Sequence, residues 1–361
     1  MSSGKINMLQ VSMILMLMNG LTDHVIVNPM LLDASGRDSW ITVLTTGIWA
    51  LPWCALLVFI MKKSGQHKLQ PWLARQTHPV IAWLLVAPLC IQLYFIGAMT
   101  VVHTSIWTVT NYLPATPRYA LVLALVLVCG YAAKLGIQAI AISSGILLPT
   151  VAVLGYFVAI TNTQNKDYQL LKPFLEHGLQ PVLHGMIYTG GGLMELIVIL
   201  LLQHHIRKKV KVWQLLLLAL ILIYITLGPI IGAITEFGPQ EAAKQMVSPY
   251  EQWRLVKLGD YIEHVDFLTV YQWLAGASVR VSLAQFLLAD VLPLRGEWRH
   301  RLILGITVSY FIISMVSVNQ DDFYRWMYRI YFPYSLALIL LLTFVFLFIS
   351  LFAKSAKGEA A

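Results

Sequence analysis

Long apolar runs, separated by short polar stretches, recur along the whole chain. Each run approaches the ~20 residues that an α-helix needs to cross a bilayer. We predict ten membrane-spanning helices, at residues 8–32, 39–61, 80–110, 117–134, 137–160, 183–204, 212–235, 262–290, 302–318 and 331–352. The predicted fold class is therefore an all-α integral membrane protein. Residues 1–361 are expected to form a single polytopic membrane domain.

The segments between the runs add two predictions. Spans four and five are joined by little more than "YAAKLG", which predicts a tight helical hairpin. Two longer segments, 165–183 and 237–264, precede spans six and eight, and we expect both to form helices that lie in the membrane interface.

Composition supports the membrane assignment. Of the 361 residues 58% are hydrophobic and 12% are charged, whereas soluble domains carry about 25% charged residues. The net charge of +8 does not indicate nucleic-acid binding, because the basic residues cluster in the short segments between spans. Cys54, Cys90 and Cys129 lie in apolar runs without a C-x-x-C spacing, so we expect packing roles and no metal or disulfide framework.

The distribution of basic residues predicts the orientation. Most of them fall in alternate connecting segments, which the positive-inside rule places in the cytoplasm. Both termini are then expected to be cytoplasmic, as an even number of spans requires. "MLQVSMILMLM" leads into the first span without a small-residue cleavage site, so this span is expected to be retained.

Two of the predicted spans contain helix-breaking sequences. Span one is interrupted by "NGLTDH" (19–24), and span six contains "YTGGGLMEL" (188–196). Each glycine in a helix interior costs about 1 kcal/mol relative to alanine. Interrupted spans in first and sixth place indicate a five-plus-five inverted repeat, with repeats near 8–160 and 183–352, and both breaks are expected to face a site at mid-membrane.

Broken helices expose chemistry that a ligand can use. Unwound backbone offers free N–H and C=O groups, and helix N-termini carry partial positive charge. Such a pocket can hold the carboxylate and ammonium groups of an amino acid. The candidate binding residues at the two breaks are Asn19, Gly20, Leu21, Thr189, Gly191 and Gly192. The alternative, that the glycines permit close helix packing, stays open.

Several stretches occur in a familiar order. They are "KINMLQVSMILML", "DSWITVL", "LLKPFLEHGLQPVLHG", the glycine-rich span six, "GDYIEHVDFLTVYQW" and "GITVSYF". Together they resemble the B subunit of bacterial spore germinant receptors, within the amino acid–polyamine–organocation transporter superfamily. The resemblance covers nearly the whole chain and implies a LeuT-like fold, a spore inner-membrane location, and assembly with an A and a C subunit. His264 stands where the family would have arginine.

Arg280 is the most unusual single residue because it lies near the middle of span eight. A charge at this depth costs at least ~2.5 kcal/mol and usually faces a partner or a polar cavity. Ala284 shares its helix face. Two roles stay open: contact with a ligand carboxylate, or an internal ion pair, for which Glu195 is the natural partner. For Glu195 itself, we favour a structural role over contact with the ammonium group of a ligand.

Other polar and aromatic positions are weaker candidates. By analogy with the fold, span three would contribute Tyr94 and Ile96, with Gly97 and Thr100 nearby. Asp23 and His24, just after the break in span one, indicate a hydrated cavity. His103 and His184 are interpreted as ordinary interfacial residues. Glu263 and Asp266 are assigned to an interhelical clamp or to a surface for partner subunits.

Catalytic signatures such as H-E-x-x-H, a P-loop or G-x-S-x-G are absent from the sequence, so we predict neither an enzyme nor a cofactor. Our first hypothesis is a sensor that binds a small nutrient, most simply an amino acid, between the broken spans and signals to partner subunits. The alternative is an amino-acid secondary transporter with the same fold. A third option is a scaffold or ion conduit without a ligand of its own.

Overall fold

Long apolar helices dominate the computed structural model, which describes residues 4–257 and 264–353. Within this part of the chain, nine helical stretches are long and apolar enough to cross a membrane. The all-helical membrane class is therefore confirmed.

The first half of the chain follows the predicted spans closely. Span one consists of α1 (Met8–Leu21), the π-helical turn η1 (Thr22–Ile26) and α2 (Asn28–Ser35). The following helices are α3 (Ser39–Lys63), α4 (Leu69–Gln76), α5 (Pro79–Asn111), α6 (Arg118–Leu135) and α7 (Ile137–Thr161). Gly136 alone separates α6 from α7 and adopts a φ of 101°, which confirms the tight hairpin. The short α4 was not predicted.

The second half contains a composite helix at span six. It runs from α8 (Gln180–Leu193) through the 3₁₀ turn η5 (Met194–Val198) and α9 (Ile199–Leu202) to the 3₁₀ turn η6 (Gln203–His205). The remaining long helices are α10 (Val212–Phe237), α13 (Phe267–Val291), α14 (Glu297–Met315) and α16 (Phe332–Phe352). The short helix α15 (Gln320–Trp326) and a second π-helical turn, η7 (Met327–Tyr331), precede α16.

The ninth predicted span corresponds to α14. Helix α14 lies where span 302–318 was expected, yet it is not among the nine apolar stretches. Its first turns carry Glu297, Arg299 and Arg301, and these charges shorten the apolar run. Helix α14 packs against α5 and α6, so it belongs to the bundle.

The expectation of interfacial helices before spans six and eight is only partly correct. Segment 165–183 forms the short 3₁₀ turn η4 (Tyr168–Leu171) and then irregular backbone up to the start of α8 at Gln180, because Pro173 has no backbone N–H and Gly178 adopts a positive φ of 75°. Segment 237–264 contains two short helices, α11 (Pro239–Ala242) and α12 (Ser248–Arg254), and its residues 258–263 fall outside the described part of the chain.

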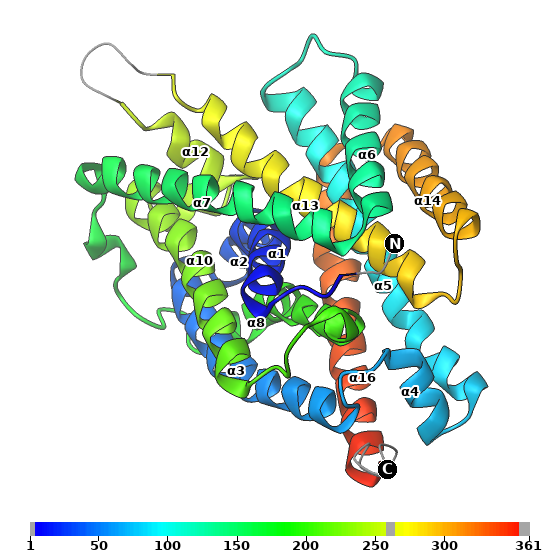
Figure 1. The fold of residues 1–361 in the computed structure, drawn as a ribbon. Coiled ribbons are helices and arrows are strands. Elements are labelled where there is room, and N and C mark those ends of the chain that lie inside the picture. Colours follow the sequence, from blue (N-terminus) through cyan, green and yellow to red (C-terminus); the bar gives the residue numbers. More distant parts are fainter. Residues whose placement is uncertain (1–3, 258–263, 354–361) are drawn as a thin grey trace.

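The composite helix and span one form the interior of the bundle. The most apolar part of Gln180–His205 is 89% buried, against 22% for Ile137–Asn165. Figure 1 shows α1 and α2 near the middle of the molecule, with α3, α7, α10 and α13 around them. The outer helices expose large apolar side chains, such as Leu127, Val128 and Ile146, as expected of surfaces that face lipid.

One end of the bundle gathers the basic segments. The backbone N–H of Ile6 donates to the carbonyl of His205 (2.9 Å), and the N–H of Arg207 donates to the carbonyl of Ile6 (2.9 Å). Ser64, just after α3, donates its hydroxyl to the side-chain oxygen of Gln203 (3.0 Å). The start of the chain therefore lies beside the segments that follow spans two and six, which agrees with the predicted grouping of basic residues on one side.

Candidate functional site

The glycine run of span six is helical. Gly190–Gly192 lie inside α8, and the irregular backbone begins only at Met194 in η5. The prediction of an unwound break at the glycines is therefore wrong. A Cβ atom on Gly192 would overlap Oδ1 of Asp23, and one on Gly191 would lie 2.9 Å from Cδ1 of Phe332. The glycines permit close packing of α8 against span one and α16, and this need outweighs their low helix propensity.

The discontinuity in span one lies slightly after its predicted position. Asn19, Gly20 and Leu21 belong to α1, and the π-helical turn η1 follows, with the N–H of Val27 donating to the carbonyl of Thr22 (2.8 Å). Single π turns within helices occur frequently at functional sites. This turn directs Asp23 towards Gly192, so the irregular part of span one meets the glycine face of α8.

A completely buried ion pair lies at the centre of the bundle. Arg280 of α13 donates from both terminal nitrogens to Glu195 of η5, at 2.5 Å and 2.8 Å, and both side chains are 0% exposed. The Nε of Arg280 donates to the hydroxyl of Thr100 on α5 (2.9 Å), and one Nη donates to the carbonyl of Met18 on α1 (3.1 Å). Of the two roles left open for Arg280, the structure shows the internal ion pair.

The same network connects the two discontinuous spans. The hydroxyl of Thr22 donates to Glu195 (3.2 Å), and the side-chain amide of Asn19 donates to the carbonyl of Gly192 (3.2 Å). The carbonyl of Gly192 thus accepts a hydrogen bond from Asn19, and Asp23 occupies the space where a Cβ atom of Gly192 would lie. We call Asn19, Asp23, Glu195 and Arg280 the polar centre. It joins span one, η5 and α13, and the bond from Arg280 to Thr100 connects it to α5.

Asp23 is the chemically incomplete member of the polar centre. Its side chain is 0% exposed, and neither carboxylate oxygen has a hydrogen-bond partner. The side-chain oxygens of Asn19 and Asn28 are likewise buried without donors. Glu195 and Arg280 neutralise each other, so an ionised Asp23 leaves one negative charge. Because a buried charge is unfavourable unless it is paired, the site requires a proton or a cationic group beside Asp23.

The other predicted site residues are divided between this centre and other places. Ile96, Thr189 and Ala284 are fully buried, and the hydroxyl of Thr189 donates to the carbonyl of Gly185 in its own helix (3.3 Å). Tyr94 lies apart: its hydroxyl donates to Ser309 of α14 (2.9 Å), and its ring packs on Tyr310. A Cβ on Gly20 would meet no atom within 4 Å, so Gly20 faces away from α8.

The ionisable residues near the ends of spans are also separated. His24 contacts the carbonyl of Ile225 on α10 through Nδ1 (3.2 Å) and does not join Asp23. Burial raises the pKa of Tyr250, whose hydroxyl donates to Asp266 (3.3 Å). Asp266 therefore contacts α12, while Glu263 of the predicted clamp falls outside the described residues.

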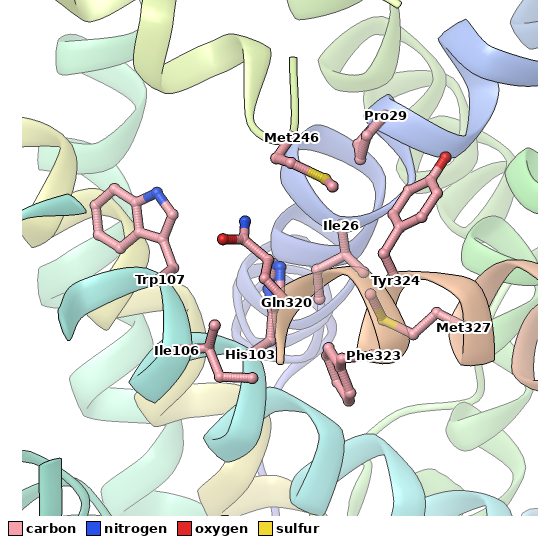
Figure 2. Close-up of a pocket in the computed structure, with 10 residues that line it drawn as sticks. All are labelled: Ile26, Pro29, His103, Ile106, Trp107, Met246, Gln320, Phe323, Tyr324 and Met327. Carbon is pink, nitrogen blue, oxygen red and sulfur yellow. The ribbon is translucent and has the colours of Figure 1, made fainter. Parts of the chain in front are cut away.

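A small pocket lies beside η1, and the sequence did not indicate it. Figure 2 shows its lining, which comes from η1, α2, α5, the segment before α12, α15 and η7: Ile26, Pro29, His103, Ile106, Trp107, Met246, Gln320, Phe323, Tyr324 and Met327. The ring of His103 packs on Trp273 (5.1 Å between centroids), which stacks on Trp107 (4.2 Å). His103, interpreted from sequence as an ordinary interfacial residue, lines this pocket together with Ile26, which ends the same π-helical turn that carries Asp23.

The apolar helices of the bundle define a multi-pass membrane protein. The family model described as spore germination protein matches residues 5–323. Spore germination protein XB of Bacillus anthracis is 42% identical over 355 residues, 97% of this chain and 100% of its own length. Spore germination protein A2 of Bacillus subtilis (strain 168) is 22% identical, over 88% of this chain and 87% of its own. The chain belongs to the spore germination protein family.

Proposed function

We propose that this chain is the nutrient-sensing membrane subunit of a spore germinant receptor. The observation that carries the proposal is the buried polar centre, built where the π turn of span one meets the glycine face of α8, in a chain whose relatives are germination proteins. The ligand is a small nutrient with an ammonium group, most simply an amino acid.

Asp23 supplies the ligand contact in this proposal. Its carboxylate oxygens, like the side-chain oxygen of Asn19, can accept a cationic group without breaking an existing hydrogen bond, and of these groups the carboxylate carries the charge. Arg280 cannot bind a ligand carboxylate unless it releases Glu195. In this proposal the ligand reaches Asp23 through the small pocket, because Ile26 and Pro29, which line the pocket, follow Asp23 closely in the sequence.

Signalling follows from the position of the network. A ligand group at Asp23 must separate η1 from Gly192, and the hydrogen bonds from Asn19 and Thr22 connect this movement to η5 and Arg280. A ligand that binds one arrangement more tightly shifts the population towards it. We propose that A and C subunits in the spore inner membrane respond to that shift, with both termini of this chain in the cytoplasm and the two halves of the bundle related as inverted repeats.

Replacing Asp23 with asparagine tests the ligand contact. The change keeps the size of the side chain and removes its charge. We expect the nutrient concentration for half-maximal germination to rise by about 10- to 100-fold, because a hydrogen bond to a charged group contributes roughly 1.5–3 kcal/mol. The measurement is the loss of optical density of spores at increasing nutrient concentration, at equal abundance of the variant.

Asp321→Asn, at an exposed position in α15, is the matched control and should leave the response unchanged. An unchanged half-maximal concentration for Asp23→Asn would contradict the proposed contact. Net uptake of the labelled nutrient by liposomes that contain the purified chain would instead support the transporter alternative.

A further inference from the structure

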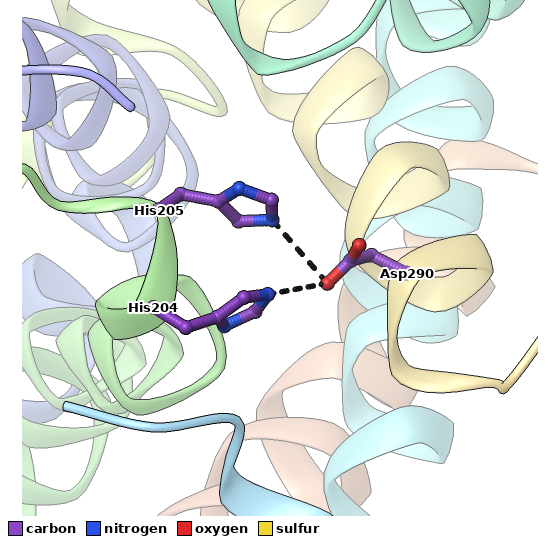
Figure 3. Close-up of side chains that lie close together, drawn as sticks. All are labelled: His204, His205 and Asp290. Carbon is purple, nitrogen blue, oxygen red and sulfur yellow. Dashed lines mark hydrogen bonds and ion pairs between the residues drawn. The ribbon is translucent and has the colours of Figure 1, made fainter. Parts of the chain in front are cut away.

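A second polar cluster lies at the end of the bundle that also holds the start of the chain. His204 and His205 end the composite helix in η6, and Asp290 occupies the last turn of α13. The Nε2 atoms of His204 and His205 lie 2.9 Å and 3.3 Å from the same carboxylate oxygen of Asp290. Figure 3 shows both rings directed at this oxygen from one side.

Two ring nitrogens of the cluster have no hydrogen-bond partner. Nε2 of His205 has no hydrogen-bond partner, although the side chain is only 5% exposed, and Nδ1 of His204 is also buried without one. Buried polar atoms in proteins are nearly always paired. The buried Nε2 of His205, which faces the carboxylate of Asp290, is therefore available to bind a ligand.

The donor set identifies the class of that ligand. One ligand atom from each of the three residues lies within 4.8 Å of the others. Two imidazole nitrogens and one carboxylate oxygen form a ligand set used by zinc, whose bonds of about 2.0–2.1 Å place neighbouring ligand atoms roughly 3.3 Å apart in a tetrahedron. The distances of 2.9 Å and 3.3 Å are close to this spacing.

We propose that His204, His205 and Asp290 bind a divalent transition-metal ion, with zinc as the best fit, and leave a fourth position for water. A small cavity beside the cluster, lined in part by Lys68, Leu201 and Asp290, gives access to that position. The ion joins the ends of spans six and eight. A ligand that binds only this arrangement stabilises it, so the metal holds this end of the bundle closed.

Lys68 is the natural competitor of the metal. Its ammonium group lies 3.5 Å from the same carboxylate oxygen of Asp290 and also donates to the backbone carbonyl of that residue. The side chain is 34% exposed, so it can turn towards solvent when a metal ion arrives. The metal site and a purely structural ion pair therefore differ in what they predict for removal of Lys68.

Calorimetric titration of the purified full-length chain in detergent with Zn²⁺ tests the proposal. We expect one binding site for Zn²⁺. His205→Ala removes one of the three ligands and should weaken zinc binding by about 100-fold, the upper end of the loss seen when a residue that only supports a metal ligand is removed. Lys68→Ala should tighten binding by about 10-fold, since a like charge is removed. His300→Ala, at an exposed histidine of α14, is the control and should bind as the wild type does.

Cobalt provides a second measurement, because Co²⁺ in a tetrahedral site of this kind shows visible absorption that Zn²⁺ abolishes by competition. Equal zinc affinity in the wild type, His205→Ala and Asp290→Asn would overturn the proposal. If the histidine variant does not accumulate, Lys68→Ala decides alone: tighter binding supports the site, and unchanged or weaker binding contradicts it.

Discussion

Arg280→Met is expected to destabilise the protein by about 3–5 kcal/mol, the usual effect of removing one partner of a buried ion pair. Glu195 is completely buried and would keep its charge without the two bonds that it receives from Arg280. Thr100 and the carbonyl of Met18 would also lose their donor. The measurement is unfolding of the purified chain in detergent, followed by tryptophan fluorescence.

Two further variants make this result specific. Arg301→Met removes an exposed ion pair with Glu297, whose side chains are 61% and 81% exposed, and should change stability by no more than about 1 kcal/mol. The double variant Arg280→Met/Glu195→Leu should recover most of the lost stability, because apolar replacement of both charges is often neutral. Equal stability of Arg280→Met and Arg301→Met would contradict the structural role of the central pair.

Gly192→Ala is expected to abolish most of the nutrient response while the protein still accumulates. The backbone at Gly192 is helical, so alanine suits its conformation, but the added Cβ overlaps Asp23 Oδ1 and lies 3.2 Å from Val27 Cγ2. Such overpacking typically costs about 1–3 kcal/mol. The new methyl group also moves the carboxylate away from the face of α8, where we propose that the ligand binds.

Gly228→Ala is the matched control, because a Cβ at this position of α10 meets no atom within 4 Å. It should preserve the response and can add up to about 1 kcal/mol through helix propensity. Both variants are compared by germination of spores and by abundance in the membrane fraction. A full response from Gly192→Ala at normal abundance would show that the contact with Asp23 plays no part in sensing.

Apolar run length predicted most of the fold. The helices that follow the first span begin and end within a few residues of the predicted runs, except where polar residues enter an element, as at the start of α13 and α14. The short helix α4 was missed because its few apolar residues, such as Trp72 and Leu73, are buried against neighbouring elements that no local pattern shows. The pattern of apolar and polar residues predicts the length and polarity of a helix, but it does not predict the tertiary contacts that bury a short helix such as α4.

The glycine run shows where local propensity misleads. Three glycines predicted unwinding, yet α8 continues through them because Asp23 and Phe332 occupy the space that side chains would fill. The contacts that decide this lie far away in the sequence. The π turn in span one carries no composition signal of its own, and it displaces the irregular backbone from Asn19 to the residues after Leu21.

Charged residues in apolar runs were the most informative single positions. An ion pair between Arg280 and Glu195 was one of two predicted roles for Arg280, because an isolated charge at that depth is costly. The structure shows this ion pair. His204 and Asp290 lie 86 positions apart in the sequence, so only the fold brings the two histidines and this acid together. An acid near the end of span eight and two histidines at the end of span six were the available signals.

The central claim is that this chain determines a nutrient response. Germination of spores that lack only this gene, measured as loss of optical density across a panel of amino acids, sugars and nucleosides, tests it most directly. We predict that the response to at least one amino acid disappears and returns with the wild-type gene. An identical response to every nutrient with and without the gene would contradict the claim.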